Sequence, residues 1–440
     1  MSLFGAMNSA ISGLTSQSNA FGDISDNVAN SQTVGFKRVD TSFVDFLTTS
    51  TATRNDPGAV VARPDYLNGV QGTITQTDSP LNLAIAGQGF FAVTQQTGQS
   101  NGAPVFNPQQ FYSRAGDFSL NSQGYLVNSS GQFLNGWPAN PVSGVINQNA
   151  LAPIQIAQTA LNPVATSTVD LSANLPATPA AGTATAASPI SSNITVYDAL
   201  GTAHTVSLGW SLNAANDWTV TVTAPDAATP AVGTADVQFG PQTSGNPVSA
   251  GTIGQIGQAT GNITTGGYIA GSAATMSMVM DFGSGPQTVS LNLGSYGGAV
   301  GVTQYAGTAY DLQGLSQNGV PPGNYSGVSM QANGSVVVNY NNGQSRTIAQ
   351  VPLVTFNNPD ALQRQNGQSF TTTIASGNAL AEQVNTNGAG SLVVSSVESS
   401  NVDIATEFSK LIVAQQAYSA NTKVVTTAND MLQATINMKQ

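Results

Sequence analysis

The sequence predicts a mainly β protein with a long α-helix at each terminus. In this prediction the N- and C-terminal helices form a coiled-coil inner domain, and two or more β domains are inserted outward between them. Two observations support it. Apolar residues near both ends repeat at alternating steps of three and four residues, and the middle of the chain consists of short apolar runs separated by turn dipeptides.

Both terminal segments follow a heptad line without proline, which predicts two long helices. In the N-terminal helix the predicted subunit-packing residues are Leu3, Met7, Leu14, Phe21, Ile24 and Val28. In the C-terminal helix they are Ile404, Phe408, Leu411, Tyr418, Val425, Leu432 and Ile436. Ser400, followed three residues later by Asp403, predicts a capping box at the start of the second helix.

Several positions on these heptad lines are polar, among them Gln17, Gln415, Thr422 and Asn429. Helices with such seams are marginal in isolation and become stable when several pack together. Two interpretations remain open. The helices pair within one monomer as an ordinary core hairpin, or they become ordered on oligomerisation. Their position at both extreme ends of the chain favours the second, a bundle shared between subunits.

Between the ends, helical periodicity disappears and turn signals replace it. Residues 117–134 contain Gln123-Gly124 and Ser130-Gly131, which predict three strands joined by two turns. Residues 328–348 contain Asn333-Gly334 and Asn342-Gly343, and Asn-Gly is the strongest two-residue signal for a hairpin. After residue 222 the chain is rich in Gly, Ser and Thr as far as about residue 310, and this composition predicts a loose region.

This pattern predicts a chain that runs outward and returns, which brings its two ends together. The predicted domains are a terminal helical coiled-coil domain (1–30 with 401–440), a connecting segment (31–75 with 360–400), an inner β domain (76–150 with 311–359) and an outer β domain (151–310).

Composition excludes several classes of function. The chain has 440 residues, a net charge of −11, no cysteine and a single histidine, His204. It therefore lacks the residues for disulfides, thiolate metal sites and multi-histidine metal centres. Its 10 basic residues are too few and scattered for the basic surface that nucleic acid requires. No membrane insertion is predicted, because no stretch approaches 18 apolar residues. No cleavable secretory signal is predicted either, because the N-terminus has no basic region and its apolar residues are spaced apart.

No catalytic, cofactor-binding or metal-binding residue is predicted, and the chain is not expected to be an enzyme. Gly87-Gln88-Gly89 lacks the third glycine and the following helix of a dinucleotide loop, and it predicts a tight turn between strands. Neither a GxSxG elbow nor a P-loop occurs. His204 stands at the start of a predicted strand and is interpreted as a structural residue.

The segment after the first predicted helix carries a motif. Residues 27–38 resemble an element that follows the first helix in the axial proteins of the bacterial flagellum, the family of rod and hook proteins. The matching residues are Asn27, Asn30, Thr33, Gly35, Phe36 and Lys37. Further blocks resemble the same family in the same order, namely residues 83–91, 112–118, 124–127, 400–403 and 412–421.

Within this family the sequence resembles the hook members rather than the rod members. The length leaves room for an inserted outer domain. Residues 196–204 resemble a strand and turn of the hook outer domain, and residues 327–359 resemble its return into the inner domain. No match is found for residues 220–310.

The resemblance implies a structural subunit that polymerises into a curved flexible tube, a universal joint that transmits torque from rod to filament. It implies no cofactor, export through the flagellar type III apparatus without a cleaved signal peptide, and an extracellular location in the hook on the basal body. The implied partners are further copies of the chain, the distal rod, the hook cap, the hook–filament junction proteins and the export apparatus. The absence of cysteine agrees with passage of an unfolded chain through a narrow channel.

Three alternatives remain. A distal rod or hook–filament junction protein of the same family would share the terminal motifs and differ in its outer region. An extracellular β-rich adhesin would carry a regular repeat of about 20–50 residues, and none is visible. A polysaccharide hydrolase would need two carboxylates about 5–10 Å apart in one cleft.

Overall fold

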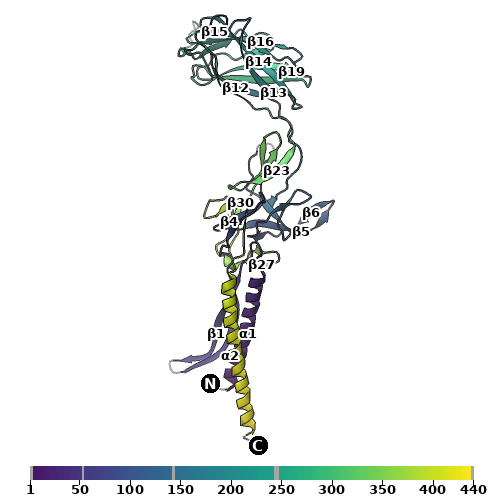
Figure 1. Cartoon of the computed structure of the whole chain (residues 1–440), viewed down its shortest axis with the longest axis vertical. Helices are drawn as coiled ribbons and strands as arrows, with labels where there is room; N and C mark the ends of the chain where they lie inside the picture. The colour runs from purple at the N-terminus through teal and green to yellow at the C-terminus, as the bar shows by residue number, and fades with distance from the viewer. Residues whose placement is uncertain (1–2, 52–53, 141–143, 242–246, 438–440) are drawn as a thin grey trace. The chain divides into compact units, whose positions relative to one another are not determined.

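The computed structural model describes residues 3–51, 54–140, 144–241 and 247–437, and it has a long helix at each end with strands between them (Figure 1). Helix α1 spans Leu3–Ala29 and helix α2 spans Ile404–Asn437. The predicted mainly β fold with helical termini is confirmed. The chain divides into two compact units. The first consists of Met1–Gln158, Ser326–Asn339 and Ser345–Gln440, and the second of Thr159–Tyr325 with Tyr340–Gln344.

The start of α2 differs from the prediction. Oδ1 of Asp403 accepts hydrogen bonds from the backbone N–H groups of Ala405 (2.9 Å) and Thr406 (3.3 Å). Asp403 is therefore the N-cap, where a carboxylate also interacts favourably with the helix dipole. The capping box predicted from Ser400 is wrong, because Oγ of Ser400 accepts a hydrogen bond from the N–H of Val402 outside the helix (3.3 Å).

A long antiparallel hairpin follows α1. Its strands are β1 (Val39–Thr51) and β2 (Arg54–Tyr66). The hairpin runs beside the two helices (Figure 1). This hairpin lies in residues 31–75, which were predicted only as a connecting segment, although β-branched and aromatic residues such as Val39, Thr41 and Phe43 favour strands.

The rest of the first unit consists of short strands and one 3-10 helix. They are β3 (Ile74–Gln76), β4 (Leu83–Ala86), β5 (Phe91–Ser100), β6 (Ala103–Phe106), β7 (Phe111–Ser113), β8 (Ser119–Leu120), β9 (Leu126–Val127), β10 (Gln132–Pro138), β11 (Ala152–Pro153), β23 (Tyr325–Met330), β24 (Ser335–Tyr340), β25 (Ser345–Gln350), β26 (Leu353–Thr355), η1 (Pro359–Ala361), β27 (Gln363–Gln365), β28 (Ser369–Thr371), β29 (Leu380–Glu382), β30 (Ser391–Val394) and β31 (Ser396–Glu398). The main sheet has the order β23-β24-β25-β10-β5-β7-β28-β27.

Strand pairing in this unit joins segments from opposite ends of the chain. β3 pairs with β31, and β4 pairs with β30. The aromatic rings of Phe90, Phe356 and Phe370 pack edge to face beside the main sheet, with centroids 5.6–5.7 Å apart. The hairpin turn predicted at Asn333-Gly334 joins β23 to β24, and Gly334 has the positive φ of +85° that such a turn requires.

The second unit packs two sheets face to face. One has the order β18-β19-β20-β12-β21 with β22 beside β12, and the other has the order β13-β14-β15-β16-β17. The strands are β12 (Thr168–Asn174), β13 (Ile190–Tyr197), β14 (Ala203–Ala214), β15 (Asp217–Thr223), β16 (Ala231–Phe239), β17 (Ile253–Gly257), β18 (Ile263–Thr265), β19 (Ala273–Asp281), β20 (Pro286–Ser295), β21 (Val302–Thr303) and β22 (Asp311–Gln317). Trp210 and Trp218 are fully buried in the core between the sheets.

The prediction of a loose region up to residue 310 is wrong, because strands β16–β21 occupy much of it. In β19, Met276, Met278 and Met280 are buried and alternate with half-buried residues. The outward positions carry the Ser and Thr residues that resembled loop composition. The compact unit also extends to Tyr325, whereas the predicted outer domain ends at residue 310.

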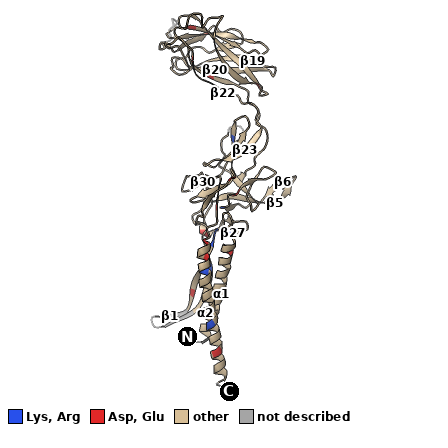
Figure 2. Ribbon diagram, viewed as in Figure 1, with Lys and Arg blue, Asp and Glu red and all other residues tan. Residues whose placement is uncertain are grey.

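Charge is distributed unevenly along the chain. No Lys or Arg occurs between Arg114 and Arg346, so the Thr159–Tyr325 segment of the second unit has none (Figure 2). The same segment holds seven aspartates, no glutamate and the single histidine. His204 is therefore the only basic side chain in the sequence of this segment.

Candidate assembly site

Helices α1 and α2 pack against each other along a seam that combines small, polar and aromatic residues. Ala414 and Ala428 of α2 are about 95% buried (5% and 4% exposed). A Cβ atom added to Gly13 would lie 2.8 Å from Nδ2 of Asn421, so the helices approach closely there. The rings of Phe21 and Tyr418 meet edge to face with centroids 6.2 Å apart.

The other face of α1 packs against the hairpin. Oγ of Ser16 donates a hydrogen bond to the carbonyl oxygen of Val60 (2.9 Å), and Oγ of Ser12 accepts one from the N–H of the same residue (3.1 Å). Oγ of Ser9 donates to the carbonyl oxygen of Gly58 (3.3 Å). These serines satisfy backbone groups of β2 that have no neighbouring strand on that side. Helix α1 is thus held between α2 and the hairpin.

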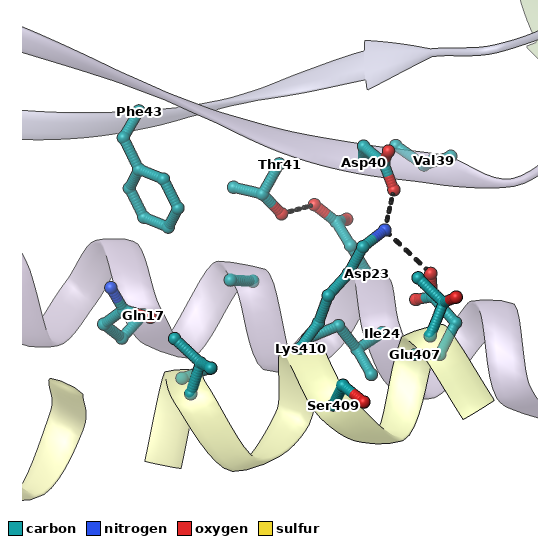
Figure 3. A pocket seen from close by; sticks show the side chains of 14 residues that line it. Gln17, Asp23, Ile24, Val39, Asp40, Thr41, Phe43, Glu407, Ser409 and Lys410 are labelled. Carbon is teal, nitrogen blue, oxygen red and sulfur yellow. Dashed lines mark hydrogen bonds and ion pairs between the residues drawn. The ribbon is translucent and has the colours of Figure 1, made fainter. Parts of the chain in front are cut away.

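A groove of about 500 Å³ lies where α1, α2 and β1 meet (Figure 3). At its polar end Nζ of Lys410 donates hydrogen bonds to Oδ1 of Asp40 (2.6 Å) and Oε1 of Glu407 (2.9 Å). Oγ1 of Thr41 donates to Oδ2 of Asp23 (2.5 Å). Val413 lines the apolar part of the groove and is 65% exposed.

This network fixes the charge of Lys410. Burial disfavours its ammonium form, but the hydrogen bonds and negative charges of Asp40 and Glu407 outweigh burial and raise the pKa of Lys410. Glu407 is fully buried, and its other oxygen, Oε2, accepts a hydrogen bond from Nδ2 of Asn27 (3.0 Å). Hydrogen bonds of Glu407 and Lys410 in α2 therefore link this helix to both α1 and β1.

The predicted packing residues separate into two groups. Within the single chain Ile24 is buried, and Met7, Leu14, Phe21, Val28, Leu411, Val425 and Leu432 are half-buried. Four of the predicted residues are 41–62% exposed, namely Ile404, Phe408, Tyr418 and Ile436. The side chain of Leu3 lies outside the described residues.

The heptad line missed other exposed apolar residues of the same elements. Ile412 and Val413 of α2 are 53% and 65% exposed, and Phe43 and Phe46 of β1 are 46% and 47% exposed. Ile412 and Val413 stand beside Leu411 but off the seven-residue repeat. The signal that could have found them is the total apolar content of α2, which exceeds what one seam can cover.

The first half of the family motif ends α1 and begins the hairpin. Oδ1 of Asn27 accepts a hydrogen bond from the N–H of Val39 (2.9 Å), and its Nδ2 donates to the carbonyl oxygen of the same residue (2.8 Å). The fully buried Asn27 thus acts as a pairing partner for the first residue of β1. Nδ2 of Asn30 donates to Asp26 (2.9 Å), and Oδ1 of Asn30 accepts from Oγ1 of Thr33 (3.2 Å), which closes the turn after the helix.

The second half of the motif joins this turn to the β part of the unit. The N–H of Gly35 donates to the carbonyl oxygen of Glu398 (2.8 Å), and Gly35 adopts a φ of +69°. A Cβ atom there would lie 2.4 Å from the backbone nitrogen of Ala115. The guanidinium of Arg364 lies over the ring of Phe36, 5.1 Å from its centroid.

Lys37 belongs to a buried cluster of three charges. Its Nζ pairs with Oε1 of Glu398 (2.5 Å), and Nη1 of Arg114 pairs with Oε2 of Glu398 (3.0 Å). All three side chains are fully buried. Lys37 also donates to the carbonyl oxygen of Val70 (2.6 Å), and the N–H of Gly72 donates to Oε1 of Glu398 (2.8 Å). The cluster therefore ties the segment after α1 to the strand before α2.

Two cations share one carboxylate in this cluster. Burial lowers the pKa of Lys37 to about 8, although the charge of Glu398 opposes this shift, and the charge of Arg114 lowers it further. Burial also lowers the pKa of Arg114. Sequence reasoning singled out Lys37 by resemblance but missed Glu398, because no spacing links residues 361 positions apart.

We expect the stability of the first unit to depend on pH through Lys37. The pKa of Lys37 is about 8 in the folded chain and 10.5 ordinarily, so the unfolded chain binds more protons between these values. The contribution of Lys37 to the free energy of unfolding should therefore rise with pH across this window. Urea denaturation of the wild type and of Lys37→Met at about pH 7.5 and pH 9.5 measures the effect. The free energy of unfolding of the wild type, relative to that of Lys37→Met, should be higher at the higher pH. An unchanged difference between the two proteins would contradict the lowered pKa of Lys37.

Neither a metal-ligand cluster nor a membrane-spanning helix is found in the part of the chain that the structure describes. The described residues include no group of three or more His, Asp or Glu side chains arranged to hold a metal ion. Among the described helices, none combines the length and the apolar character needed to cross a membrane.

Three family models match successive parts of the chain. Residues 84–170 match the flagellar hook protein FlgE/F/G D1 domain, residues 165–320 match the flagellar basal body protein FlaE D2 domain, and residues 394–438 match the flagellar basal body rod FlgEFG protein C-terminal model. The crystal structure of Helicobacter pylori flagellar hook protein FlgE2 has a similar fold, with a TM-score of 0.50 and 13% identity over 74% of this chain and 100% of that one.

Relatives match over the whole length. The flagellar hook protein FlgE of Brucella abortus is 31% identical over 441 residues, which cover 100% of both chains. The flagellar hook protein FlgE of Salmonella typhimurium is 31% identical over 439 residues, which cover 98% of this chain and 99% of the relative. The chain therefore belongs to the flagellar hook protein family.

Proposed function

We propose that α1, α2 and the β1–β2 hairpin form the polymerising part of a hook subunit. The observation that carries this proposal is the exposure of large apolar side chains on all three elements. They include Phe4, Ile11, Phe43, Phe46, Phe408, Ile412, Val413 and Ile436, each between 46% and 65% exposed. Apolar residues concentrated in this way mark an interface, because a single chain gains nothing by leaving them in water.

Membership of the hook family makes the chain a structural subunit of the bacterial flagellar hook, an extracellular appendage built from copies of this subunit. A role as a universal joint between rod and filament fits that place. We further infer that the terminal helices of neighbouring subunits pack together as an inner coiled-coil tube. The polar and small residues of the α1–α2 seam then hold the pair within one chain, and the exposed apolar residues hold neighbouring pairs.

The distribution of charged residues suggests how such a tube bends without breaking. The buried charges of Lys37, Arg114 and Glu398 fix the β part of the first unit to the segments that carry the helices. Bending is then taken up between subunits, where few ion pairs have to break because the second unit carries so few charges. Each row of subunits would shorten and lengthen once per revolution.

We retain the four-part layout as a proposal, with a terminal helical domain (1–30 with 401–440), a connecting segment that includes the hairpin, and inner and outer β domains. We also propose export through the flagellar type III apparatus without a cleaved signal peptide, and contacts with the distal rod, the hook cap and the hook–filament junction proteins. The family resemblance supports these proposals, and the absence of cysteine agrees with export of an unfolded chain.

Replacing Val413 by aspartate tests the polymerising role. Because Val413 is 65% exposed in the single chain, we expect the variant to fold with unchanged helicity and thermal stability. A charge buried between subunits should nevertheless raise the concentration needed for polymerisation by at least about tenfold. Sedimentation and electron microscopy at raised salt measure this directly.

The matched control is Gln416→Asp, which adds the same charge to the same helix at an exposed polar position. It should polymerise like the wild type. Tubes from Val413→Asp at the wild-type concentration would rule out this face of α2 as an interface.

A further inference from the structure

The single histidine of the chain lies between two carboxylates. Nε2 of His204 is 3.6 Å from Oδ2 of Asp198, and Nδ1 is 3.6 Å from Oδ2 of Asp226. The ring stacks on Phe282 with centroids 4.0 Å apart and planes inclined by 10°. The side chains of His204 and Asp198 are only 10% and 4% exposed, whereas that of Asp226 is 62% exposed.

Three turns of the second unit meet at this ring. Asp198 lies in the turn between β13 and β14, Asp226 in the loop between β15 and β16, and Phe282 in the turn between β19 and β20. The last two are also joined by a hydrogen bond from the N–H of Ala228 to the carbonyl oxygen of Asp281 (2.8 Å). The histidine therefore connects turns from both sheets of this unit.

The arrangement favours one charge state of the ring. A neutral imidazole has one N–H and one lone pair, so one of its nitrogens would face a carboxylate oxygen with a lone pair. An imidazolium carries an N–H on each nitrogen and attracts both carboxylates through charge, at separations (3.6 Å) longer than a hydrogen bond. Asp281 precedes Phe282 in the chain, and its Oδ1 accepts hydrogen bonds from the N–H groups of Gly283 (2.8 Å) and Gly285 (3.2 Å). The charged groups paired with the ring, Asp198 and Asp226, are both acidic, and residues 115–345 contain no Lys or Arg.

The turn that holds Asp198 rests on the two segments by which the chain enters and leaves the second unit. We call residues 159–166 and 318–325 the neck. They pair through bridges between Leu161 and Gly323 and between Val164 and Val320. A Cβ atom added to Gly201, in the turn, would lie 2.5 Å from Cδ of Pro322 and 2.6 Å from Cβ of Pro163. The turn and the neck are therefore in direct contact.

Asp198 shapes that turn. Its Oδ1 accepts hydrogen bonds from the N–H groups of Leu200 (2.9 Å) and Thr202 (2.7 Å), and its carbonyl oxygen accepts one from Gly201 (3.0 Å). Burial acts against the charge of Asp198, but these donors and His204 lower its pKa. One oxygen of the Asp198 carboxylate thus binds the turn and the other faces His204, and this arrangement holds the turn against the neck.

We propose that His204 is held as an imidazolium between Asp198 and Asp226, and that this ionic clamp holds the neck against the sheets of the second unit. His204 is then a positioning residue that acts on the neck through Asp198. The inference concerns the single folded chain and does not rest on the proposed polymerisation.

The charge of the ring can be observed directly. A full-length chain labelled with ¹⁵N-histidine and kept below its polymerisation concentration gives signals from one imidazole only, because there is one histidine. At neutral pH we expect the two nearly equal nitrogen shifts of an imidazolium. The widely split shifts of a neutral ring would overturn the proposal without any variant.

The seating of the neck is tested by hydrogen exchange on full-length variants. In His204→Gln and Asp226→Asn, the amides of the turn and of Leu161 and Val164 should exchange roughly tenfold faster, because the clamp is lost. Asp311→Asn removes one charge from exposed strand β22 and should leave them unchanged. Equal exchange in all variants would show that the neck does not depend on the clamp.

Discussion

Replacing Glu398 by glutamine is expected to lower the free energy of unfolding of the first unit by about 3–5 kcal/mol, the loss typical of a broken buried ion pair. Lys37 and Arg114 are both fully buried, and Glu398 is the carboxylate that both of them contact. Glutamine keeps the shape but leaves two cations without a counter-charge. Thermal unfolding, together with hydrogen exchange of peptides that cover β3 and β31, measures the effect.

The matched variants are Lys37→Met and Arg114→Met, which each leave one cation paired with Glu398. Each should lower the free energy of unfolding clearly less than Glu398→Gln does, because one buried ion pair of zero net charge remains. Both cations also donate to a carbonyl oxygen, Lys37 to that of Val70 and Arg114 to that of Gly87. Arg114→Met should cost more than Lys37→Met, since Arg114 also lies over the ring of Phe90. Equal losses in the three variants would mean that hydrogen bonding rather than charge balance holds the cluster.

Gly35→Ala is expected to be nearly as damaging. Gly35 has a φ of +69°, which costs alanine about 1 kcal/mol, and the new Cβ would lie 2.4 Å from the backbone nitrogen of Ala115. The backbone of Ala115 cannot rotate out of the way as a flexible side chain can. The turn after α1 therefore has to move away from Arg114 and Ala115. We expect a total loss of roughly 3 kcal/mol or more, measured by urea denaturation.

Gly22→Ala provides the control for the same substitution. Gly22 lies inside α1, and an added Cβ would meet nothing within 4 Å. Alanine should therefore stabilise the helix by roughly 0.5–1 kcal/mol. If Gly35→Ala behaved like Gly22→Ala, the close contact between this turn and Ala115 would be absent in solution.

The terminal helices could be predicted because periodicity is a local property of sequence. The heptad lines placed both helices within a few residues of their observed ends. They could not say which apolar residues one chain covers. Ala414 is buried and Val413 exposed because of where α1 lies, and that depends on contacts between residues about 400 positions apart.

The charge cluster and the histidine clamp could not be predicted for the same reason. Glu398 is one of many acidic residues in the sequence, and nothing nearby distinguishes it. Its role follows from the pairing of β3 with β31, which brings it opposite Ile74. His204 was interpreted as structural, and the sequence gives no sign that the loop holding Asp226 reaches it.

The absence of Lys and Arg between Arg114 and Arg346 has a consequence for chemistry on the assembled or isolated protein. Trypsin cleaves only after these residues, so residues 115–346 leave a digest as one peptide whether they are folded or not. Amine-reactive dyes and crosslinkers find no lysine there either, and they attach only to the N-terminus and to lysines near the two ends of the chain. A secreted subunit of this composition presents trypsin-like proteases in its surroundings with no bond to cut throughout that stretch.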